Sequence, residues 1–380
     1  MLLCLVASAQ NPATNSYTQT NLVSDIPGMA VGADPHLVNP WGLSRPASAT
    51  LTEAHWWASD EATGISTLYD ANGAIDQLTV TIPPASGTGT GSPTGTVAIG
   101  GNFVFVTLDG AITEWLAATG PPQPNFSHFS APAQACTNCH TTTSTIKVNH
   151  SSQKTSYTGV TLVGSTLYAA ASTGIEAYTT SFVPVTLGAG AFTDPNVPAG
   201  YTPYGIQSVG QKIYVTFSPL PPASGGYVDV FNTSGKLLLS LQNGTWFDEP
   251  WGIALAPASF GAFSGSLLVG NTGSGQIAAF NATTGKFQGL LKNSSGQPLS
   301  NPGLWAIYFG AGNTQSGPVN TLYFNAGIQN FAHGLFFDAA SSASENRKSR
   351  CFEGPHTDGA SLLTPACSMA NACERAAREK

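Results

Sequence analysis

A short phrase that recurs six times limits what this 380-residue chain can fold into more than any other feature of the sequence. In its complete form the phrase is proline, any residue and glycine, followed by apolar residues that favour a strand. Counted between glycine slots, the copies are 53, 64, 46, 47 and 54 residues apart, which indicates one structural unit copied along the chain. The third copy has Tyr157 in the proline slot and the sixth has Ala306 in the glycine slot. The copies are Asn39-Pro-Trp-Gly-Leu43, Ser92-Pro-Thr-Gly-Thr-Val97, Ser156-Tyr-Thr-Gly-Val160, Thr202-Pro-Tyr-Gly-Ile206, Glu249-Pro-Trp-Gly-Ile253 and Gly303-Leu-Trp-Ala-Ile307.

Further strand patterns follow each phrase. An apolar segment comes first, at 55–59, 103–107, 166–170, 212–216, 266–270 and 321–325. A glycine-containing turn then leads to a second segment, at 64–69, 111–115, 174–178, 226–231, 276–280 and 334–337. This second segment alternates apolar with small or polar residues, which predicts half-buried strands. A fourth strand is clearest at 236–240 and 286–291.

Six such units predict an all-β fold, a six-bladed β-propeller of four-stranded antiparallel blades. We expect the strand opened by Pro-x-Gly to be innermost, because blades crowd near the axis, where small residues fit. An array of two β-sandwich domains is the alternative, but sandwiches do not repeat one phrase at a fixed offset. The sixth unit lacks a clear fourth strand, whereas the segment 17–23 has strand character and no partner. We therefore expect the N-terminal strand to complete the last blade and close the ring.

The composition agrees with this fold and excludes one class of partner. Only 9% of the residues are charged, where about 25% is usual, and such a chain rarely forms many exposed helices. With 13 Lys+Arg and a net charge of −7, the chain lacks a basic face, so we expect no nucleic-acid partner. The hydrophobic share of 42% supports a buried core, and we expect a monomer.

The two ends of the chain differ from its middle. Residues 1–10 read as the end of a signal peptide, because an apolar run precedes Ala7-Ser8-Ala9; a frayed apolar terminus is the alternative. No other stretch approaches the roughly 18 apolar residues of a membrane span, so we expect a secreted, periplasmic or cell-surface protein. Residues 341–380 hold six of the 13 basic residues and three of the six cysteines. We expect a disordered tail there, or non-native sequence, outside a propeller at 11–340.

Several long runs resemble a known family. They are 20–30, 34–43, 66–70, 190–196, 250–257, 260–270 and 333–336. These runs are similar to a family of exported bacterial proteins associated with PEP-CTERM sorting systems, and the Pro-x-Gly-Ile units resemble NHL repeats. The resemblance covers about residues 17–338 and implies a β-propeller and export. It implies no catalytic residues.

The sharpest local motif is Cys136-Thr-Asn-Cys139-His140. C-x-x-C-H is the attachment signature of c-type haem, in which two thiols bind the haem and the histidine supplies an axial ligand. The same residues could bind zinc together with His150 or His128. In an oxidising compartment the two cysteines could instead form a local disulfide. The sequence leaves these three interpretations open.

A second candidate site consists of polar residues that follow the second strands. Six-bladed lactonases hold a calcium-type ion with carboxylate and amide oxygens near the channel, and these residue types suit such an ion. The alternative is that Asp and Asn only make turns with nearby backbone. His55 and His333 could act as a general base beside the ion, or be packed against aromatic neighbours. The candidate ligands are Asp60, Asp109, Asn271 and Asn325, with Ser172 and Ser218 in the other two blades.

Two further patterns lie at the start of the innermost strands. Asp34 and Asp194 each open an Asp-Pro segment, and they could bind an ion or ligand or cap a turn. Aromatic residues occupy the variable slot of four phrases, and they could form a sugar-binding ring at the channel mouth or pack between blades. These residues are Trp41, Tyr204, Trp251 and Trp305.

The sequence therefore supports two functions of different classes. The leading prediction is a secreted, NHL-like binding or scaffold propeller without enzymatic activity, whose partner is a cell-surface protein or a polysaccharide. The competing prediction is a metal-dependent hydrolase or lactonase with its site at the channel. A Gly-rich phosphate loop, a G-x-S-x-G elbow and an H-E-x-x-H motif are all missing from the sequence, which favours the first.

Overall fold

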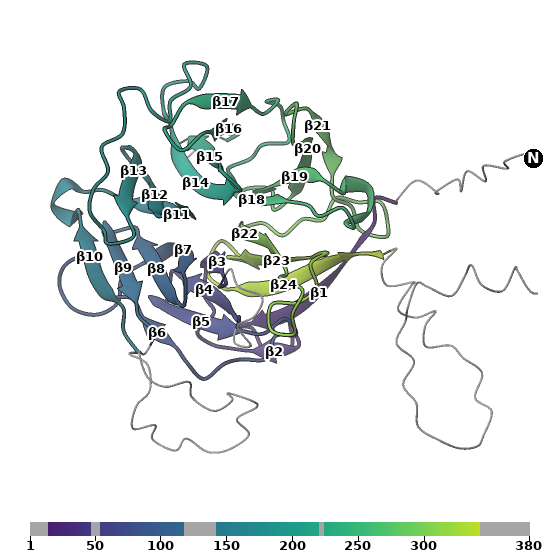
Figure 1. Cartoon of the computed structure of the whole chain (residues 1–380). Helices are drawn as coiled ribbons and strands as arrows, with labels where there is room; N and C mark the ends of the chain where they lie inside the picture. Colours follow the sequence, from purple (N-terminus) through teal and green to yellow (C-terminus); the bar gives the residue numbers. More distant parts are fainter. Residues whose placement is uncertain (1–13, 47–53, 118–141, 220–223, 343–380) are drawn as a thin grey trace, which may run out of the picture. The chain divides into compact units, whose positions relative to one another are not determined.

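The structure is a computed structural model that describes residues 14–46, 54–117, 142–219 and 224–342. Within these residues six β-sheets surround a common axis, which confirms the all-β six-bladed propeller (Figure 1). The innermost strand of each blade contacts that of the next, and the sixth contacts the first, so the ring is closed. The expected signal peptide at 1–10 and the tail beyond Ser342 lie outside the described residues.

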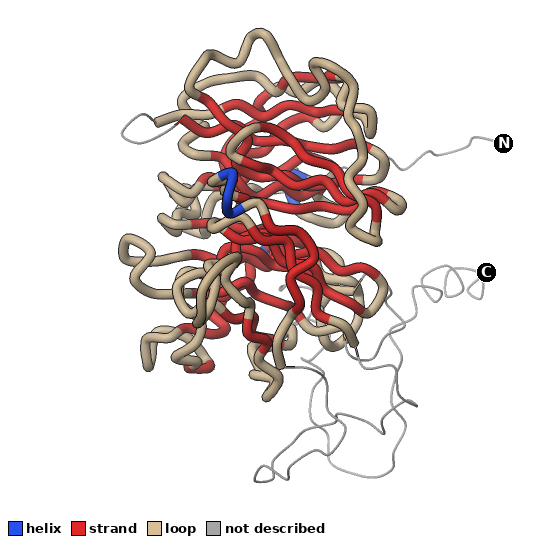
Figure 2. Tube along the Cα trace, turned by 90° about the vertical axis from the view of Figure 1, so that its left-hand side faces the viewer, coloured by secondary structure: helices blue, strands red, loops and turns tan. Residues whose placement is uncertain are grey.

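Each blade is an antiparallel sheet whose strands follow the chain from the axis outward (Figure 2 shows them from the side, with loops at the strand ends). Among the described residues, helix is limited to two short 3-10 turns, η1 (Ser151–Gln153) and η2 (Gly261–Phe263), and no helix is long and apolar enough to cross a membrane. Blade 1 contains β3 (Pro40–Ser44), β4 (Trp56–Asp60), β5 (Ile65–Tyr69) and β6 (Val80–Thr81), and blade 2 contains β7 (Pro93–Ile99), β8 (Asn102–Thr107), β9 (Ala111–Trp115) and β10 (Thr145–Asn149). Blade 3 contains β11 (Tyr157–Val163), β12 (Thr166–Ala171) and β13 (Gly174–Thr179), and blade 4 contains β14 (Tyr201–Val209), β15 (Lys212–Pro219), β16 (Tyr227–Phe231) and β17 (Leu237–Ser240). Blade 5 contains β18 (Pro250–Leu255), β19 (Ser266–Asn271), β20 (Ile277–Asn281) and β21 (Phe287–Leu290).

The third blade departs from the four-strand pattern. Its sheet has three strands, and the place of the fourth is taken by an isolated bridge between Tyr178 and Pro184. Two backbone hydrogen bonds flank the bridge, from the Thr179 N–H to the Val183 carbonyl and from the Val185 N–H to the Ala177 carbonyl, both at 2.8 Å, so the segment pairs only briefly with β13.

The sixth blade is closed by the N-terminal strand, as predicted. Its chain-order strands are β22 (Leu304–Phe309), β23 (Thr321–Ala326) and β24 (Leu335–Ser341), and β1 (Tyr17–Ser24) pairs antiparallel with β24 along its whole length. A short strand, β2 (Gly32–Ala33), lies parallel to β1 and forms a fifth strand of this sheet. The Tyr17 side chain also reaches blade 5, where its hydroxyl donates to the Phe260 carbonyl at 3.0 Å.

The glycine of the repeated phrase is required because neighbouring innermost strands almost touch. In all six blades the ladder between the first two strands shifts register at the phrase, so the variable residue bulges out of the ladder. A Cβ atom on Gly42 would lie 2.5 Å from the carbonyl oxygen of Thr94 in the next blade. One on Gly95 would lie 2.6 Å from the Val160 nitrogen, and Gly205 and Gly252 are tighter still.

The hydrophobic core is divided among the seams between neighbouring blades. Each seam contains its own cluster of buried residues from the two sheets that face it. In the seam between blades 1 and 2, for example, Trp57 stacks on Phe103 with ring centroids 3.8 Å apart. Full burial of one large apolar side chain stabilises a fold by about 1.5–3 kcal/mol, so the seams supply most of the stability.

Candidate functional site

An aromatic plug fills the axis at the end where the innermost strands begin. It consists of the four aromatic residues in the variable slot of the phrase, which the bulges turn out of the ladders. Trp41 stacks on Trp305 with centroids 3.6 Å apart, and it meets Trp251 edge-on at 6.5 Å and Tyr204 at 6.1 Å. Trp41, Trp251 and Trp305 are 8%, 9% and 1% exposed, so they pack on one another and leave little ring surface for a ligand.

Hydrogen bonds fix the plug to the strands around it. The indole nitrogen of Trp305 donates to Asn39 Oδ1 at 3.0 Å, and Asn39 Nδ2 donates to Glu61 Oε2 at 2.9 Å. The indole nitrogen of Trp251 donates to the Thr158 carbonyl at 3.0 Å. Burial, with a contribution from the nearby carboxylate of Glu249, raises the pKa of Tyr204, so its hydroxyl stays neutral.

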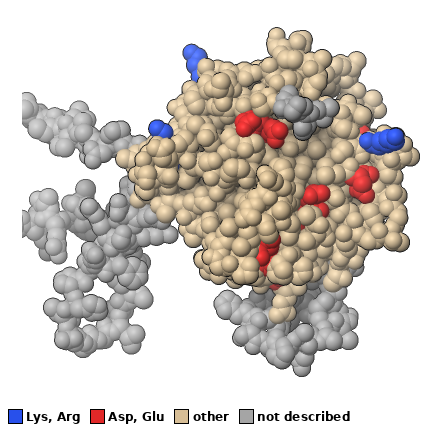
Figure 3. Space-filling model, turned by 180° about the vertical axis from the view of Figure 1, so that it is seen from behind, with Lys and Arg blue, Asp and Glu red and all other residues tan. Residues whose placement is uncertain are grey.

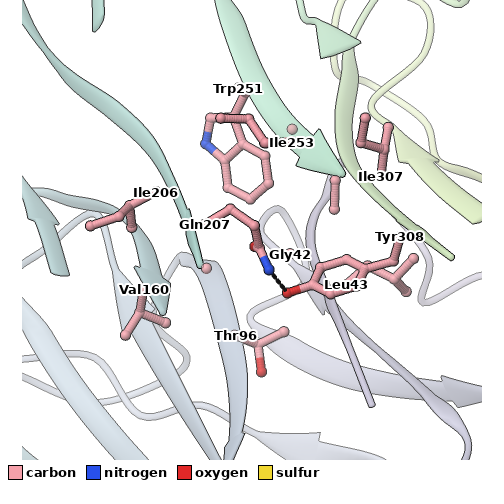
Figure 4. A pocket seen from close by; sticks show the side chains of 13 residues that line it. Gly42, Leu43, Thr96, Val160, Ile206, Gln207, Trp251, Ile253, Ile307 and Tyr308 are labelled. Atoms are coloured by element: carbon pink, nitrogen blue, oxygen red, sulfur yellow. Dashed lines mark hydrogen bonds between the residues drawn. The ribbon is translucent and has the colours of Figure 1, made fainter. Parts of the chain in front are cut away.

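Beyond the plug the channel narrows to a small cavity lined by both aliphatic and polar residues. Aliphatic side chains of the innermost strands form its wall, and the Gln207 amide donates a hydrogen bond to the Tyr308 hydroxyl across it (Figure 4). The space open to the centre of a water molecule is about 10 Å³, which is about the room that one water needs. The cavity therefore has no room for an organic substrate.

A strained turn at residues 329–331 lies at the surface beside the plug. The surface formed by this turn and the outer side of the plug is here called the mouth. Gln329, Asn330 and Phe331 have successive φ values of 53°, 57° and 66°, the left-handed region that costs a non-glycine residue about 1–2 kcal/mol. The turn holds the Phe331 ring, 41% exposed, 5.6 Å from the ring of Trp305. Strain of this kind persists where the surroundings over-determine it, and it is common at ligand-binding sites.

Hydrogen bonds at both ends of the turn hold it in place. The Gly327 N–H donates to the Gly303 carbonyl at 2.8 Å. On the other side, Asp25 accepts from the Gly334 N–H at 2.8 Å and pairs with His333 Nδ1 at 2.6 Å. His333 is thus engaged with a carboxylate and supports the mouth.

The four predicted metal ligands do not gather at one point of the channel. By strand alternation Asp60 and Asn325 both face the seam between blades 6 and 1, whereas Asn271 faces the seam between blades 4 and 5. Asp109 accepts hydrogen bonds from the Ala85 N–H at 2.6 Å and the Thr107 hydroxyl at 2.5 Å. Asn271 accepts from the Asp248 N–H at 3.0 Å. Among the described residues no three His, Cys, Asp or Glu side chains form a group that could hold a metal.

Of the predicted ligands, Asp60 has the most strongly shifted pKa. Its side chain is completely buried, and the Thr67 hydroxyl donates to its Oδ2 at 2.8 Å. Burial raises the pKa of Asp60 well above its ordinary value, and the carboxylate of Asp34 adds to the effect. The serines predicted in blades 3 and 4 lie one residue beyond the position equivalent to Asp60, where Ser172 accepts from the Ser156 N–H and Ser218 donates to the Pro219 carbonyl.

Asp34 and Asp194 fix equivalent turns in blades 1 and 4. Oδ1 of each accepts the backbone N–H two residues further on, at 2.9 Å for Asp34 and 2.8 Å for Asp194. Oδ2 accepts from the outer part of the same blade, from the Tyr69 hydroxyl and the Ser240 hydroxyl respectively. These contacts account for both carboxylates as turn caps.

The remaining predicted residues lie apart from the mouth or outside the described residues. Cys136, Cys139, His140 and His128 belong to the second group, so the haem, zinc and disulfide interpretations stay predictions. His150 Nδ1 lies 2.9 Å from the Tyr157 hydroxyl and 3.4 Å from Glu176 Oε2. His55 Nδ1 lies 3.9 Å from Asp76 Oδ2.

Sequence reasoning did not find the turn at 329–331 or the Gln207–Tyr308 bond. The turn contains no glycine, and a left-handed conformation of other residues leaves no local sequence signal. Tyr308 follows the phrase of blade 6 and Gln207 that of blade 4, and both occupy positions next to the aliphatic residues of the channel wall. A comparison of the residues that follow each phrase could have identified Gln207 and Tyr308 as polar residues of the channel wall.

Comparisons with known proteins reveal distant relatives and similar folds. No protein-family model matches the chain. It is 27% identical over 312 residues to "Uncharacterized protein R648" of Acanthamoeba polyphaga mimivirus, covering 77% of this chain and 73% of that protein. "Uncharacterized protein L690" of the same virus is 25% identical over 349 residues, with 85% of each chain covered.

Two solved structures illustrate the likeness in fold. The virginiamycin B lyase of Staphylococcus aureus has a TM-score of 0.45 and 13% identity, with 85% of this chain and 98% of that chain covered. The gluconolactonase XC5397 of Xanthomonas campestris has a TM-score of 0.46 and 10% identity, with 80% and 86% covered. The relatives found in sequence are viral, and the predicted bacterial origin, PEP-CTERM association and export stay predictions.

Proposed function

We propose that this chain is an exported, non-enzymatic binding propeller that holds a cell-surface polysaccharide at the mouth. The observation that carries the proposal is the plug: the axis is filled by aromatic rings and the cavity beyond them has room for about one water molecule. A ligand therefore binds on the surface of the ring end and not inside the channel. The exposed aromatic ring at that end is Phe331.

The chemistry of the mouth suits a carbohydrate. The C–H groups of a sugar pack against an aromatic face, and the Phe331 ring offers such a face supported from below by Trp305. Tyr204 is half-buried at the same end, and Glu61 and Glu249 lie beside the plug, where carboxylates can accept from sugar hydroxyls. Figure 3 shows one face of the molecule with Asp and Glu side chains over its middle and Lys and Arg at its edge. Such a surface suits a neutral ligand better than an anionic one.

The proposal is tested by screening the protein against a panel of immobilised polysaccharides and measuring the affinity of the best one by calorimetry. The Phe331→Ala variant should bind it about tenfold or more weakly, because one aromatic stacking contact is lost. Val319→Ala is the matched control, since Val319 is 50% exposed in the β22–β23 connection, at the opposite ends of the innermost strands. Failure of every polysaccharide to bind, or equal affinity of the Phe331→Ala variant, would count against the proposal. If the protein bound a cell-surface protein and no polysaccharide, the proposed polysaccharide ligand would be wrong and a protein would take its place.

A metal-dependent hydrolase is the second candidate. It is supported by the buried Asp60 and Asn325 side chains, each of which keeps one oxygen without a hydrogen-bond partner. Lactone or ester turnover that is lost in Asp60→Asn and kept in Phe331→Ala would favour this function over polysaccharide binding.

A further inference from the structure

We propose that His333 is the specificity-determining residue of the mouth, and that its Nε2 atom accepts a hydrogen bond from a hydroxyl group of the sugar that packs on Phe331. The inference rests on the proposed binding function and deepens it. It names the polar contact that selects a sugar with a free hydroxyl group.

The first step is the orientation of the His333 ring. His333 Nδ1 lies 2.6 Å from Asp25 Oδ2, and Asp25 Oδ1 accepts the Gly334 N–H at 2.8 Å, so the carboxylate is itself held in place. The Asp25 side chain is 10% exposed and the His333 side chain 37%. The ring is therefore held at its inner edge, and the edge that carries Nε2 faces solvent.

The second step is the position of the proton on the ring. A carboxylate only accepts hydrogen bonds, so its contact with Nδ1 places the proton of the neutral imidazole on that nitrogen. Nε2 then carries the lone pair. The bond to Asp25 is the one hydrogen bond of this ring within the described residues. His333 thus presents an oriented acceptor to a ligand.

The third step is the distance from His333 to the exposed aromatic ring of the mouth. Phe331 and His333 are two residues apart, so their Cα atoms are at most about 7 Å apart. The Phe331 N–H donates to the Gly327 carbonyl at 3.3 Å and the His333 N–H to the Ile328 carbonyl at 3.2 Å, so both residues belong to one hydrogen-bonded turn. One bound sugar therefore lies within reach of both side chains.

The fourth step is what such a pair of contacts does. Packing on an aromatic ring supplies affinity with little preference among sugars, whereas a few placed polar groups fix the orientation of a ligand. A site built to bond a hydroxyl group rejects an analogue that lacks it. Asp25 acts through His333 as a positioning residue, because it sets both the direction of the ring and the nitrogen that carries the proton.

The position of the proton is tested first, without a ligand. In protein labelled with nitrogen-15 in its histidine rings, NMR at about pH 8 should show His333 with its proton on Nδ1. The His333→Gln variant identifies the signal. Asp25→Asn should lose the preference, because an amide can donate as well as accept. A proton on Nε2 in the wild type would overturn the proposal, since the mouth would then present a donor.

Binding is tested with the polysaccharide that the wild type retains in the screen, in its native form and in an O-methylated form that has lost its hydroxyl donors. His333→Phe keeps an aromatic ring and removes Nε2, so it should bind the native form about tenfold more weakly, as measured by calorimetry. The O-methylated form should bind the wild type and His333→Phe equally weakly. Equal affinity of the two proteins for the native form would refute the proposal and leave the proposed function standing.

His55→Phe is the matched control. His55 also faces a carboxylate, with Nδ1 3.9 Å from Asp76 Oδ2, but it precedes β4 at the ends of the strands opposite the mouth. This variant should bind like the wild type, and equal weakening by both variants would contradict the assignment. If His333→Phe does not fold, the NMR spectrum of the wild type and its affinities for the two forms decide. A wild type that binds no polysaccharide would end the proposed function and this inference together.

Discussion

At the scale of single residues, we expect the buried carboxyl group of Asp229 to make the stability of this protein depend on pH. Asp229 is 1% exposed, and its Oδ2 has no hydrogen-bond partner among the described residues. Burial, together with the charge of Asp194, raises the pKa of Asp229 from its ordinary value of 3.8 to about 7. Between these pH values the folded state holds a proton that the unfolded state has released, so the free energy of unfolding falls as the pH rises.

We predict that Asp229→Asn flattens this dependence. The wild type should lose stability from about pH 4 to pH 7, by at most about 1.4 kcal/mol per pH unit from this group. The variant has no titrating group at this position and should lose less over the same interval. Urea unfolding at pH 5 and pH 8 measures both proteins. The same pH dependence in both would show that Asp229 is not the group responsible.

The residue scale is also where the sequence predicted least. Asp60 and Asn325 were identified as polar residues after the second strands, but their partners depend on which face of each strand they occupy and on which blade lies opposite. Asp34 and Asp194 were better defined, because Asp-Pro followed by an innermost strand permits few other local structures. Phe331 could not be predicted, since its position depends on a left-handed turn packed against Trp305.

At the scale of the element, the sequence predicted the innermost strand, which begins with Pro-x-Gly, most clearly. The predicted innermost strands appear as β3, β7, β11, β14, β18 and β22. In four of them the glycine meets the same steric need, because a Cβ atom on Gly42, Gly95, Gly205 or Gly252 would lie within 2.6 Å of the neighbouring blade. Strand ends and outer strands were less predictable. The fourth strand of blade 3 is reduced to one isolated bridge at Pro184, and β2 adds a parallel strand that no repeat contains.

The glycine requirement predicts the effect of one methyl group. Gly252→Ala places a Cβ atom against the Trp305 carbonyl oxygen of the next blade, so the two innermost strands must separate. We expect a loss of about 1–3 kcal/mol in the free energy of unfolding. Gly188→Ala is the control, because a Cβ atom there meets nothing within 4 Å. Denaturant unfolding compares the two variants, and equal stability would contradict the close approach of the strands.

At the scale of the whole molecule, the ring has no free edge where its ends meet. β1 supplies the outer strand of blade 6, and its residue Val23 is completely buried among core residues of the seam to blade 1. The first and last strands of the propeller are therefore parts of one sheet. The sequence predicted this closure, because the sixth unit lacks a fourth strand and the segment 17–23 before the first phrase has strand character but no partner.

Deletion of residues 11–24 tests this closure, and with it the arrangement of blades on which the mouth depends. We predict that the truncated chain loses the cooperative thermal transition of the wild type as a whole, measured by circular dichroism, because an open blade 6 exposes the seams on both sides. A truncated chain that melts at the wild-type temperature would contradict the account.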